Sequence, residues 1–332
     1  MSIYTDLDYT HTPDGHPDWQ ESFVLVFRDR ITNAVGFLRT GAYVNRGTSQ
    51  VHWGMALPDG LRFRRNRARL PFDASDRTLR SARSGPYTSY SVEADHVRFQ
   101  GHDPDAEADL RFYDFFPSQD WDAIGAEIPE HLRGGSGHPE SSGRVEGRIR
   151  LGDRVIEIAD GIGHRDHSFG PRQHNLFRTA RWHAGTVGPA LSYSLVTSAG
   201  SDGHLHKFGW IIRDGRREKI RDFHTVNMTL SDGYSTLGGW TVVLLDSGER
   251  LRIEAETIDG IVTSSHAVNG GPGSSPAGIE AISIARWNGH EGVCDFNMID
   301  NPHLGEQAIV GPLLANVDDG LSQRLFDPSW VR

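Results

Sequence analysis

Short runs of alternating apolar and polar residues, separated by Gly, Pro and Asp, recur along most of this chain. The first pair covers residues 23–27 and 35–39, with a polar turn at 28–33 between them. Alternation at period two places every second side chain on one face of a strand, and such turns join antiparallel neighbours. Nearly all connections are too short for the crossover that parallel strands need. The sequence therefore predicts an all-β fold of antiparallel β-barrels or sandwiches.

The same pattern predicts the remaining secondary structure. Further strands are expected at 50–57, 61–70, 89–99, 109–115, 144–150, 154–158, 191–197, 207–213, 225–230, 240–245, 251–257 and 278–286. Residues 121–133 offer the one plausible helix, a short one that Pro129 interrupts. Residues 269–276, rich in Gly and Pro, predict a flexible loop.

Chain length indicates two domains. The 332 residues exceed the roughly 250 at which a single core usually stops growing. The Gly-rich stretch at 134–139 is the best linker, because it ends one run of strands and precedes the next. We expect two β-barrel-like domains, at 1–137 and 138–332.

Charge and composition limit the kinds of binding partner and the cellular compartment that suit this protein. The net charge of −10 argues against nucleic acid or an anionic membrane as the main partner, since both require a positive surface. Cys294 is the single cysteine, so neither an intrachain disulfide nor a cysteine zinc cage can form, and a reducing compartment fits. The sequence shows no signal-peptide pattern and no run of about 18 apolar residues. We predict a cytoplasmic protein without a membrane span.

Residues 161–172 carry the densest group of chemically active side chains. Asp166, His167 and Ser168 stand between Arg165 and Arg172, directly after the alternating run 154–158. A carboxylate and an imidazole held near fixed positive charge have shifted pKa values, so the pattern favours proton transfer. The alternative interpretation is a tight turn after a strand, in which the charges satisfy one another in a buried network.

The seventeen histidines raise the question of a metal site. His164 with His167, and His204 with His206, are the closest pairs, and spacing i, i+2 puts two imidazoles on one face of a strand. No His-Glu-x-x-His occurs and no third ligand is spaced convincingly, so the prediction is no metal. The five arginines within 62–70 predict an edge strand with a solvated face.

Two further pairs are candidates for a pocket. Trp19 and Glu21 just precede the first strand and would lie at a barrel mouth, where they either line a pocket or cap the strand end. Trp182 and His183 are adjacent, so they lie on opposite faces of one strand and only one of them faces a given pocket.

Glu280 is an acidic residue within an otherwise apolar strand. An inward-facing carboxylate there would have a raised pKa. It is either a buried partner of Arg165 or Arg172 or an acid in its own right.

Residues 163–172 resemble the Gly-x-x-Asp-His-Ser-Trp-Gly-x-Arg signature of the carotenoid 1,2-hydratase-like group of lipocalin-related proteins. This group includes kievitone hydratase-like and fungal Diels-Alderase-like proteins. Phe169 stands where the signature has Trp, which keeps an aromatic plane but loses the indole N–H donor. The resemblance is looser at 19–27 and 278–280.

The resemblance implies two lipocalin-like β-barrel domains with an apolar pocket near their junction and no required cofactor. It also implies hydrophobic polyene, isoprenoid, polyphenol or polyketide substrates. The reactions of the group are additions to, or closures across, carbon–carbon double bonds.

Protonation of an alkene requires a carboxylic acid that stays neutral near pH 7, which an apolar pocket can arrange. We expect Asp166 to be this acid and His167 to act as the base. The aromatic faces of Trp182 and Trp210 would stabilise a developing carbocation.

Arg165 and Arg172 affect whether Asp166 can be the acid. Arg172, with Arg165, would orient the carboxylate or polarise a substrate carbonyl. An arginine close to Asp166 would instead keep it ionised, and the acid role would then pass to Glu280 or Glu21.

The sequence thus predicts a cofactor-independent hydro-lyase or cyclase/isomerase acting by proton transfer on a hydrophobic unsaturated small molecule. The predicted catalytic residues are Asp166, His167, Glu280 and Arg172, and the predicted substrate-binding residues are Arg165, Trp19, Glu21, Trp182, His183, Trp210 and Phe169. The alternative is a non-catalytic lipocalin-like carrier of a lipophilic ligand, in which the motif only braces the domain junction. The oligomeric state stays open, a homodimer included.

Overall fold

The fold is almost entirely antiparallel β structure, which confirms the predicted class. The computed structural model describes residues 3–125, 127–129, 135–172, 178–199, 204–229, 236–264, 277–300 and 314–316. Within these ranges the helical elements are three 3-10 turns: η1 (Asp6–Asp8), η2 (Val44–Arg46) and η3 (Ala74–Asp76). None of the described helical elements is long and apolar enough to cross a membrane.

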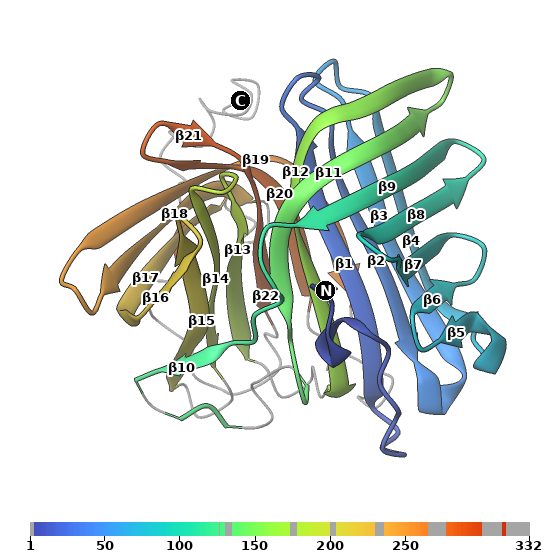
Figure 1. The fold of residues 1–332 in the computed structure, drawn as a ribbon, viewed down its shortest axis with the longest axis horizontal. Coiled ribbons are helices and arrows are strands. Elements are labelled where there is room, and N and C mark those ends of the chain that lie inside the picture. Colours follow the sequence, from blue (N-terminus) through green and yellow to red (C-terminus); the bar gives the residue numbers. More distant parts are fainter. Residues whose placement is uncertain are drawn as a thin grey trace.

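The first sheet has eleven strands and forms a half-barrel (Figure 1). In spatial order they are β4 (Arg62–Pro71), β3 (Thr48–Ala56), β2 (Val35–Tyr43), β1 (Trp19–Asp29), β12 (Arg154–Pro171), β11 (Glu140–Leu151), β9 (Ala106–Asp114), β8 (Val97–Asp103), β7 (Thr88–Val92), β6 (Ser81–Ser84) and β5 (Arg77–Thr78). The predicted first hairpin is β1–β2. The arginine-rich strand β4 lies at the edge of the sheet, as predicted.

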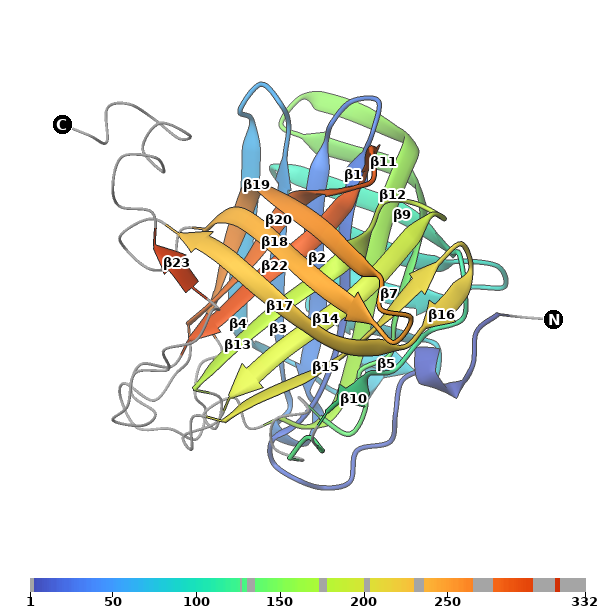
Figure 2. The same cartoon turned by 90° about the vertical axis from the view of Figure 1, so that its left-hand side faces the viewer.

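The second sheet has twelve strands and forms a nearly closed barrel. Its main path is β10 (Asp122–Ile124), β15 (Leu205–Arg213), β14 (Leu191–Ala199), β13 (Thr179–Thr186), β22 (Val293–Asp300), β20 (Ala277–Trp287), β19 (Arg250–Ser264), β18 (Thr236–Leu245), β17 (Ile220–Thr229) and β23 (Leu314–Asn316). Two short strands lie off this path: β16 (Arg216–Glu218) beside β15, and β21 (His290–Glu291) beside β20. Figure 2, in which this sheet faces the viewer, shows its strands crossing in front of those of the first.

Two predicted elements are wrong. The helix expected over 121–133 is replaced in its described part by strand β10, because residues 122–124 pair with β15. The single strand expected over 89–99 is the hairpin β7–β8, closed where Glu93 N–H donates to the carbonyl of His96. The loop predicted at 269–276 lies outside the described residues.

The motif at 161–172 is not a turn. Strand β12 runs unbroken from Arg154 to Pro171 and pairs with β1 on one side and β11 on the other. The boundary expected at 137/138 precedes β11 and β12, yet both strands are hydrogen-bonded into the first sheet. The division into two domains stays a prediction.

Four apolar clusters fill the described part of the fold, and the smallest consists of Ile128, Ala180, Val196 and Phe208. One lies inside the half-barrel and includes Phe23 and Tyr90, and another lies inside the second barrel and includes Tyr193 and Phe296. The third joins the outer faces of the two sheets, where Val24, Val26 and Phe37 of the first meet Ile261, Ile282 and Val293 of the second. The junction between the sheets is therefore itself a packed core, and the candidate site lies beside it.

Candidate functional site

Strand β12 separates the motif into two groups of side chains. Because side chains alternate along a strand, His164, Asp166 and Ser168 face the second sheet, and Arg165 and His167 face the interior of the first barrel. The ring of His164 lies 5.9 Å from that of Trp210 in the second sheet, whereas Arg165 lies over Phe112 in the first core. Asp166 and His167, predicted to act together, point to opposite faces.

Glu140 is the central residue of the junction face. It begins β11, opposite Asp166 in the register of β11 and β12, and its side chain is fully buried. Its Oε1 lies 3.6 Å from Nε2 of His138, and its Oε2 lies 3.5 Å from Nε2 of His164. Nε2 of His138 also lies 3.5 Å from Oδ1 of Asp166. A histidine thus stands between two carboxyl groups.

The two carboxyl groups have opposite pKa shifts. Burial raises the pKa of Glu140 to about 8, with smaller contributions from the charges of Asp166 and Asp120, against the lowering effects of His138 and Ser194. Glu140 is therefore protonated at neutral pH.

Burial also acts to raise the pKa of Asp166, but His138, Arg172 and Arg39 together outweigh it and hold that pKa below its ordinary value. Asp166 is ionised. Two neighbouring carboxyl groups whose surroundings move their pKa values in opposite directions are the usual basis for assigning acid and base roles.

Aromatic rings from the second sheet and from Trp121, which directly precedes β10, form a wall on this face. The ring of Trp121 lies 3.8 Å from that of His138, and Trp182 lies 6.1 Å edge-on to His164. The indole N–H groups of both tryptophans donate to the hydroxyl of Ser194, at 3.0 and 2.9 Å. Burial lowers the pKa of His164 to about 3, so this imidazole is neutral and adds to the aromatic wall.

A second acidic pair lies across the junction. Glu280 on β20 and Asp295 on β22 both have raised pKa values, caused first by burial; for Asp295 the charge of Glu280 comes next. Asn297 donates its side-chain N–H to Glu280. The expected raised pKa of Glu280 is therefore present, and its electrostatic neighbours include Arg39 and Arg172.

Buried polar atoms without a hydrogen bond of normal geometry gather at this junction. Among the described residues they are Nδ1 and Nε2 of His138, both carboxyl oxygens of Glu140, Nε2 of His164, Oδ1 of Asp166, Nε of Arg172, Nε1 of Trp210 and Oδ2 of Asp295. Native structures contain few such atoms, and each one calls for an explanation. Their concentration at one place makes this junction the candidate functional site.

Arg165 belongs to a different network, inside the first barrel. Its guanidinium donates to Asp8 at 2.6 Å, Asp114 at 2.7 Å and Ser118 at 2.9 Å, and the side chain is 2% exposed. These contacts tie the N-terminal segment to β9 and β12. Arg165 is a bracing residue and does not contact Glu280.

His167 lies in the same interior, with its ring stacked 4.2 Å from Phe23. Its Nε2 is 3.1 Å from Oε1 of Glu21, and Nδ1 of His11 is 3.3 Å from the same oxygen. Contacts with both histidines and with Arg77 hold the pKa of Glu21 below its ordinary value, although burial opposes them. Glu21 is therefore a carboxylate and not an acid at neutral pH.

The remaining predicted residues lie in different parts of the two sheets. Trp19 is buried at the start of β1, and the Arg77 guanidinium lies 5.9 Å from its ring centre. Phe169 stacks on His11 at 3.4 Å. His183 points into the second barrel, where it hydrogen-bonds with Thr241, so it lies on the opposite face of β13 from Trp182, as predicted.

Sequence reasoning missed Glu140, His138 and Asp295. His138 belongs to the Gly-rich stretch 134–139 that the sequence favours as a linker, and the next strand is expected to begin only at residue 144. The sequence signal that could have found these residues is their spacing: residues 138, 140 and 142 alternate, so they share one face of a strand. The hydroxyl of Ser142 is hydrogen-bonded to Nδ1 of His164 at 3.0 Å.

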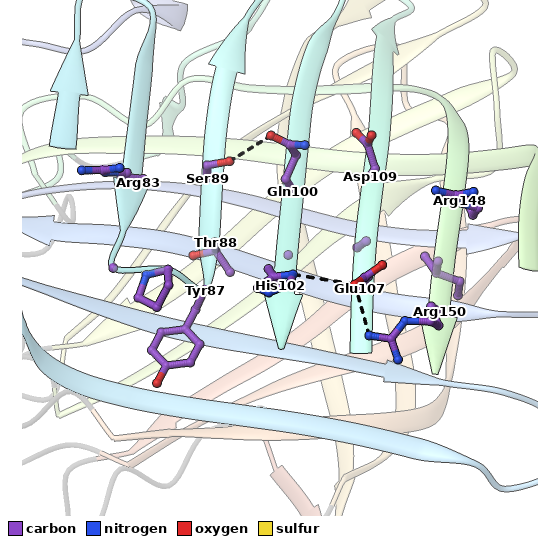
Figure 3. A pocket seen from close by; sticks show the side chains of 15 residues that line it. Arg83, Tyr87, Thr88, Ser89, Gln100, His102, Glu107, Asp109, Arg148 and Arg150 are labelled. Atoms are coloured by element: carbon purple, nitrogen blue, oxygen red, sulfur yellow. Dashed lines mark hydrogen bonds and ion pairs between the residues drawn. The ribbon is translucent and has the colours of Figure 1, made fainter. Parts of the chain in front are cut away.

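The outer face of the first sheet carries a separate hollow of about 500 Å³ over β7, β8, β9 and β11 (Figure 3). Glu107 on its floor is paired with His102 at 3.8 Å and Arg150 at 3.3 Å. The lining is charged and open to solvent, and none of the predicted site residues contributes to it. It is a solvated surface and not the hydrophobic pocket that the resemblance implies.

Two packed, almost entirely antiparallel sheets, one of them nearly closed, with a buried polar cluster at their junction, define a lipocalin-like fold. In sequence, the chain belongs to the family described as a domain of unknown function (DUF7064), which matches residues 5–302. No curated protein matches the chain.

Solved structures with the same fold have little sequence identity to this chain. A candidate AttH from Nitrosomonas europaea superposes with a TM-score of 0.65 at 12% identity, over 91% of this chain and 97% of that one. CghA gives 0.58 at 10% identity, over 90% and 95%. Kievitone hydratase from Nectria haematococca gives 0.53 at 9% identity, over 91% and 96%. These likenesses establish the fold.

Proposed function

We propose that this protein is a cofactor-independent hydro-lyase or cyclase/isomerase that acts by proton transfer on a hydrophobic, unsaturated small molecule. The observation that carries the proposal is Glu140, a fully buried carboxyl group with a pKa of about 8, held between two imidazoles and next to tryptophan rings. Such a group can donate a proton at neutral pH to a substrate that is itself only weakly basic.

The proposed reaction starts with proton transfer from Glu140 to one carbon of a double bond. The cation that develops on the other carbon faces Trp182 and Trp210, whose π-systems stabilise positive charge. The ionised Asp166 contributes a fixed negative charge on the same side.

The second step is removal of a proton. His138 accepts it either from a water molecule that adds to the cation, which completes hydration, or from a neighbouring carbon, which completes cyclisation or isomerisation. Because Nε2 of His138 lies 3.6 Å from Oε1 of Glu140, the proton can return to Glu140 and restore the starting state. Asp166, 3.5 Å from the same nitrogen, stabilises the imidazolium meanwhile.

The comparison with kievitone hydratase supports the hydratase side of this proposal through the shared fold alone. An isoprenoid, polyphenol or polyketide is the substrate class that a buried, aromatic-walled site would suit. In this mechanism Arg172 orients Asp166, while His167 and Arg165 lie on the other face of β12 and take no part.

The experiment begins with native mass spectrometry of the protein purified from its own host, followed by mass analysis of the released small molecule. That molecule is then incubated with wild-type protein, Glu140→Gln and the control Glu157→Gln, an exposed glutamate on the same strand pair. We expect a product heavier by one water, or of equal mass and altered retention. Glu140→Gln should lose about 10²-fold or more of the rate while still binding the molecule.

Two results would contradict the proposal. Unimpaired turnover by Glu140→Gln would remove the acid role of this residue. A ligand that stays bound and unchanged with the wild-type protein would indicate the lipocalin-like carrier instead.

A further inference from the structure

We propose that His11, Glu21 and His167 form a binding site for one divalent transition-metal ion of the Zn²⁺ type, inside the mouth of the first barrel. The three side chains come from the N-terminal segment, β1 and β12. One ligand atom from each lies within 4.8 Å of the others. This site is on the opposite face of β12 from Glu140 and does not depend on the proposed reaction.

The first argument is the hydrogen-bond polarity of His167. Its Nδ1 lies 2.7 Å from the carbonyl oxygen of Leu7, which can only accept, so Nδ1 carries a hydrogen. In the neutral ring, Nε2 then presents its lone pair to Oε1 of Glu21 at 3.1 Å. A proton or a metal ion must therefore lie between these two atoms, and both are ligand atoms that a transition metal accepts. An imidazole whose other nitrogen donates to a backbone carbonyl is the usual arrangement of a metal-binding histidine.

The second argument is distance. Nδ1 of His11 lies 3.3 Å from the same oxygen of Glu21, close to the 3.1 Å of His167. Ligands of a tetrahedral Zn²⁺ with bonds of about 2.0–2.2 Å stand about 3.3–3.6 Å apart. Both separations therefore fit with small movements, and a water molecule would supply the fourth ligand.

The third argument is that the neighbours hold the ligands in place. Arg77 contacts the other carboxylate oxygen of Glu21 at 3.2 Å, so Oε1 is left to face the imidazoles. The backbone N–H of His11 donates to Oε1 at 2.7 Å and fixes its orientation. Phe169 stacks on the ring of His11. A carboxylate ligand whose second oxygen is itself bonded is common in metal sites.

The ligand set also decides the kind of ion. Two imidazoles and one carboxylate suit Zn²⁺ and neighbouring first-row metals, whereas Mg²⁺ and Ca²⁺ prefer oxygen ligands throughout. The side chain of His11 is 24% exposed, while Glu21 and His167 are 3% and 0% exposed, so an ion would enter past His11. Once bound, it would fasten the N-terminal segment to the barrel.

The test is titration of chelator-treated full-length protein with Zn²⁺ by calorimetry, together with the visible absorption spectrum of bound Co²⁺. We expect one Zn²⁺ per chain and the strong absorption of four-coordinate Co²⁺. His11→Ala and Glu21→Gln should each weaken Zn²⁺ binding at least 10-fold and abolish the Co²⁺ signal. The matched control is His102→Ala, which removes an exposed histidine from another His–Glu pair and should bind as wild type does.

Three results would overturn the proposal: no stoichiometric Zn²⁺ binding, binding that His11→Ala and Glu21→Gln leave unchanged, or an octahedral Co²⁺ spectrum equal to that of the aqueous ion. The first and third results are measured on wild-type protein, so they remain valid even if a variant fails to fold. Glu140→Gln should retain Zn²⁺ binding, which separates this site from the proposed reaction.

Discussion

Replacing Glu140 with Gln should make the protein more stable, and the gain should grow with pH. In the folded protein, burial keeps this carboxyl group protonated up to a pKa of about 8, whereas its ordinary pKa is 4.5. Below pH 4.5 both the folded and the unfolded chain hold the proton, so this group no longer makes the free energy of unfolding depend on pH. Between 4.5 and 8 only the folded chain keeps the proton, so stability falls as pH rises. Above 8 the loss is complete.

The size of the effect follows from the same two values. Each pH unit between them costs about 1.4 kcal/mol, so the full loss is about 5 kcal/mol, and about 3 kcal/mol of it is present at pH 7. Gln has nearly the same shape as protonated Glu and cannot ionise. The variant should therefore match the wild type near pH 4.5 and exceed it by about 5 kcal/mol near pH 9.

The assay is urea unfolding of wild type, Glu140→Gln and Glu157→Gln at about pH 5, 7 and 9. Every other titrating group is the same in these proteins, so its contribution cancels in the difference between their free energies of unfolding. Glu157 is exposed, so its replacement should give a difference that does not change with pH. Difference infrared spectroscopy gives an independent reading, because one component of the protonated-carboxyl carbonyl stretch at pH 7 should be lost in Glu140→Gln and kept in Glu157→Gln.

A stability difference that stays constant from pH 5 to 9 would refute this reasoning. It would mean that Glu140 is ionised at neutral pH, stabilised by His138 more strongly than burial opposes it. The acid role in the proposed reaction would then lose its physical basis.

Two further substitutions test the surroundings of the site. Arg165→Met should lower the free energy of unfolding by about 3–5 kcal/mol in urea titrations, because it strands the buried carboxylates of Asp8 and Asp114; a loss under 1 kcal/mol would show that the network is solvated. Ser194→Ala should cost about 1–3 kcal/mol for each of the two indole N–H groups left without an acceptor, and should shift tryptophan fluorescence, whereas the exposed Ser247→Ala should change neither.

The strand pattern was predictable because it is local. Alternation and turn residues located the β1–β2 and β11–β12 hairpins, and they also placed Trp182 and His183 on opposite faces of one strand. The failures came from pairing that the local sequence does not encode. The segment after Trp121 is the one plausible helix in the sequence, but Pro129 would end such a helix early, and residues 122–124 pair with β15.

The site was harder to predict because its residues come from strands far apart in the chain. Glu140 acquires its raised pKa from burial beneath Ser194 and the tryptophans, which only the packing of the two sheets creates. Likewise Glu21 was a candidate acid from its position alone, and the two histidines and Arg77 around it keep it ionised.

The motif in β12 also shows why adjacent active residues need not share a site. Alternation sends Asp166 toward Glu140 and the junction, and it sends His167 toward Glu21 and the barrel interior. A proton passed between Asp166 and His167 would have to cross the sheet, so the two residues should make independent contributions. Combining Asp166→Asn with His11→Ala should therefore give additive losses, with activity following Asp166 and Zn²⁺ binding following His11. Loss of both properties in either single variant would mean that the two faces are coupled through β12.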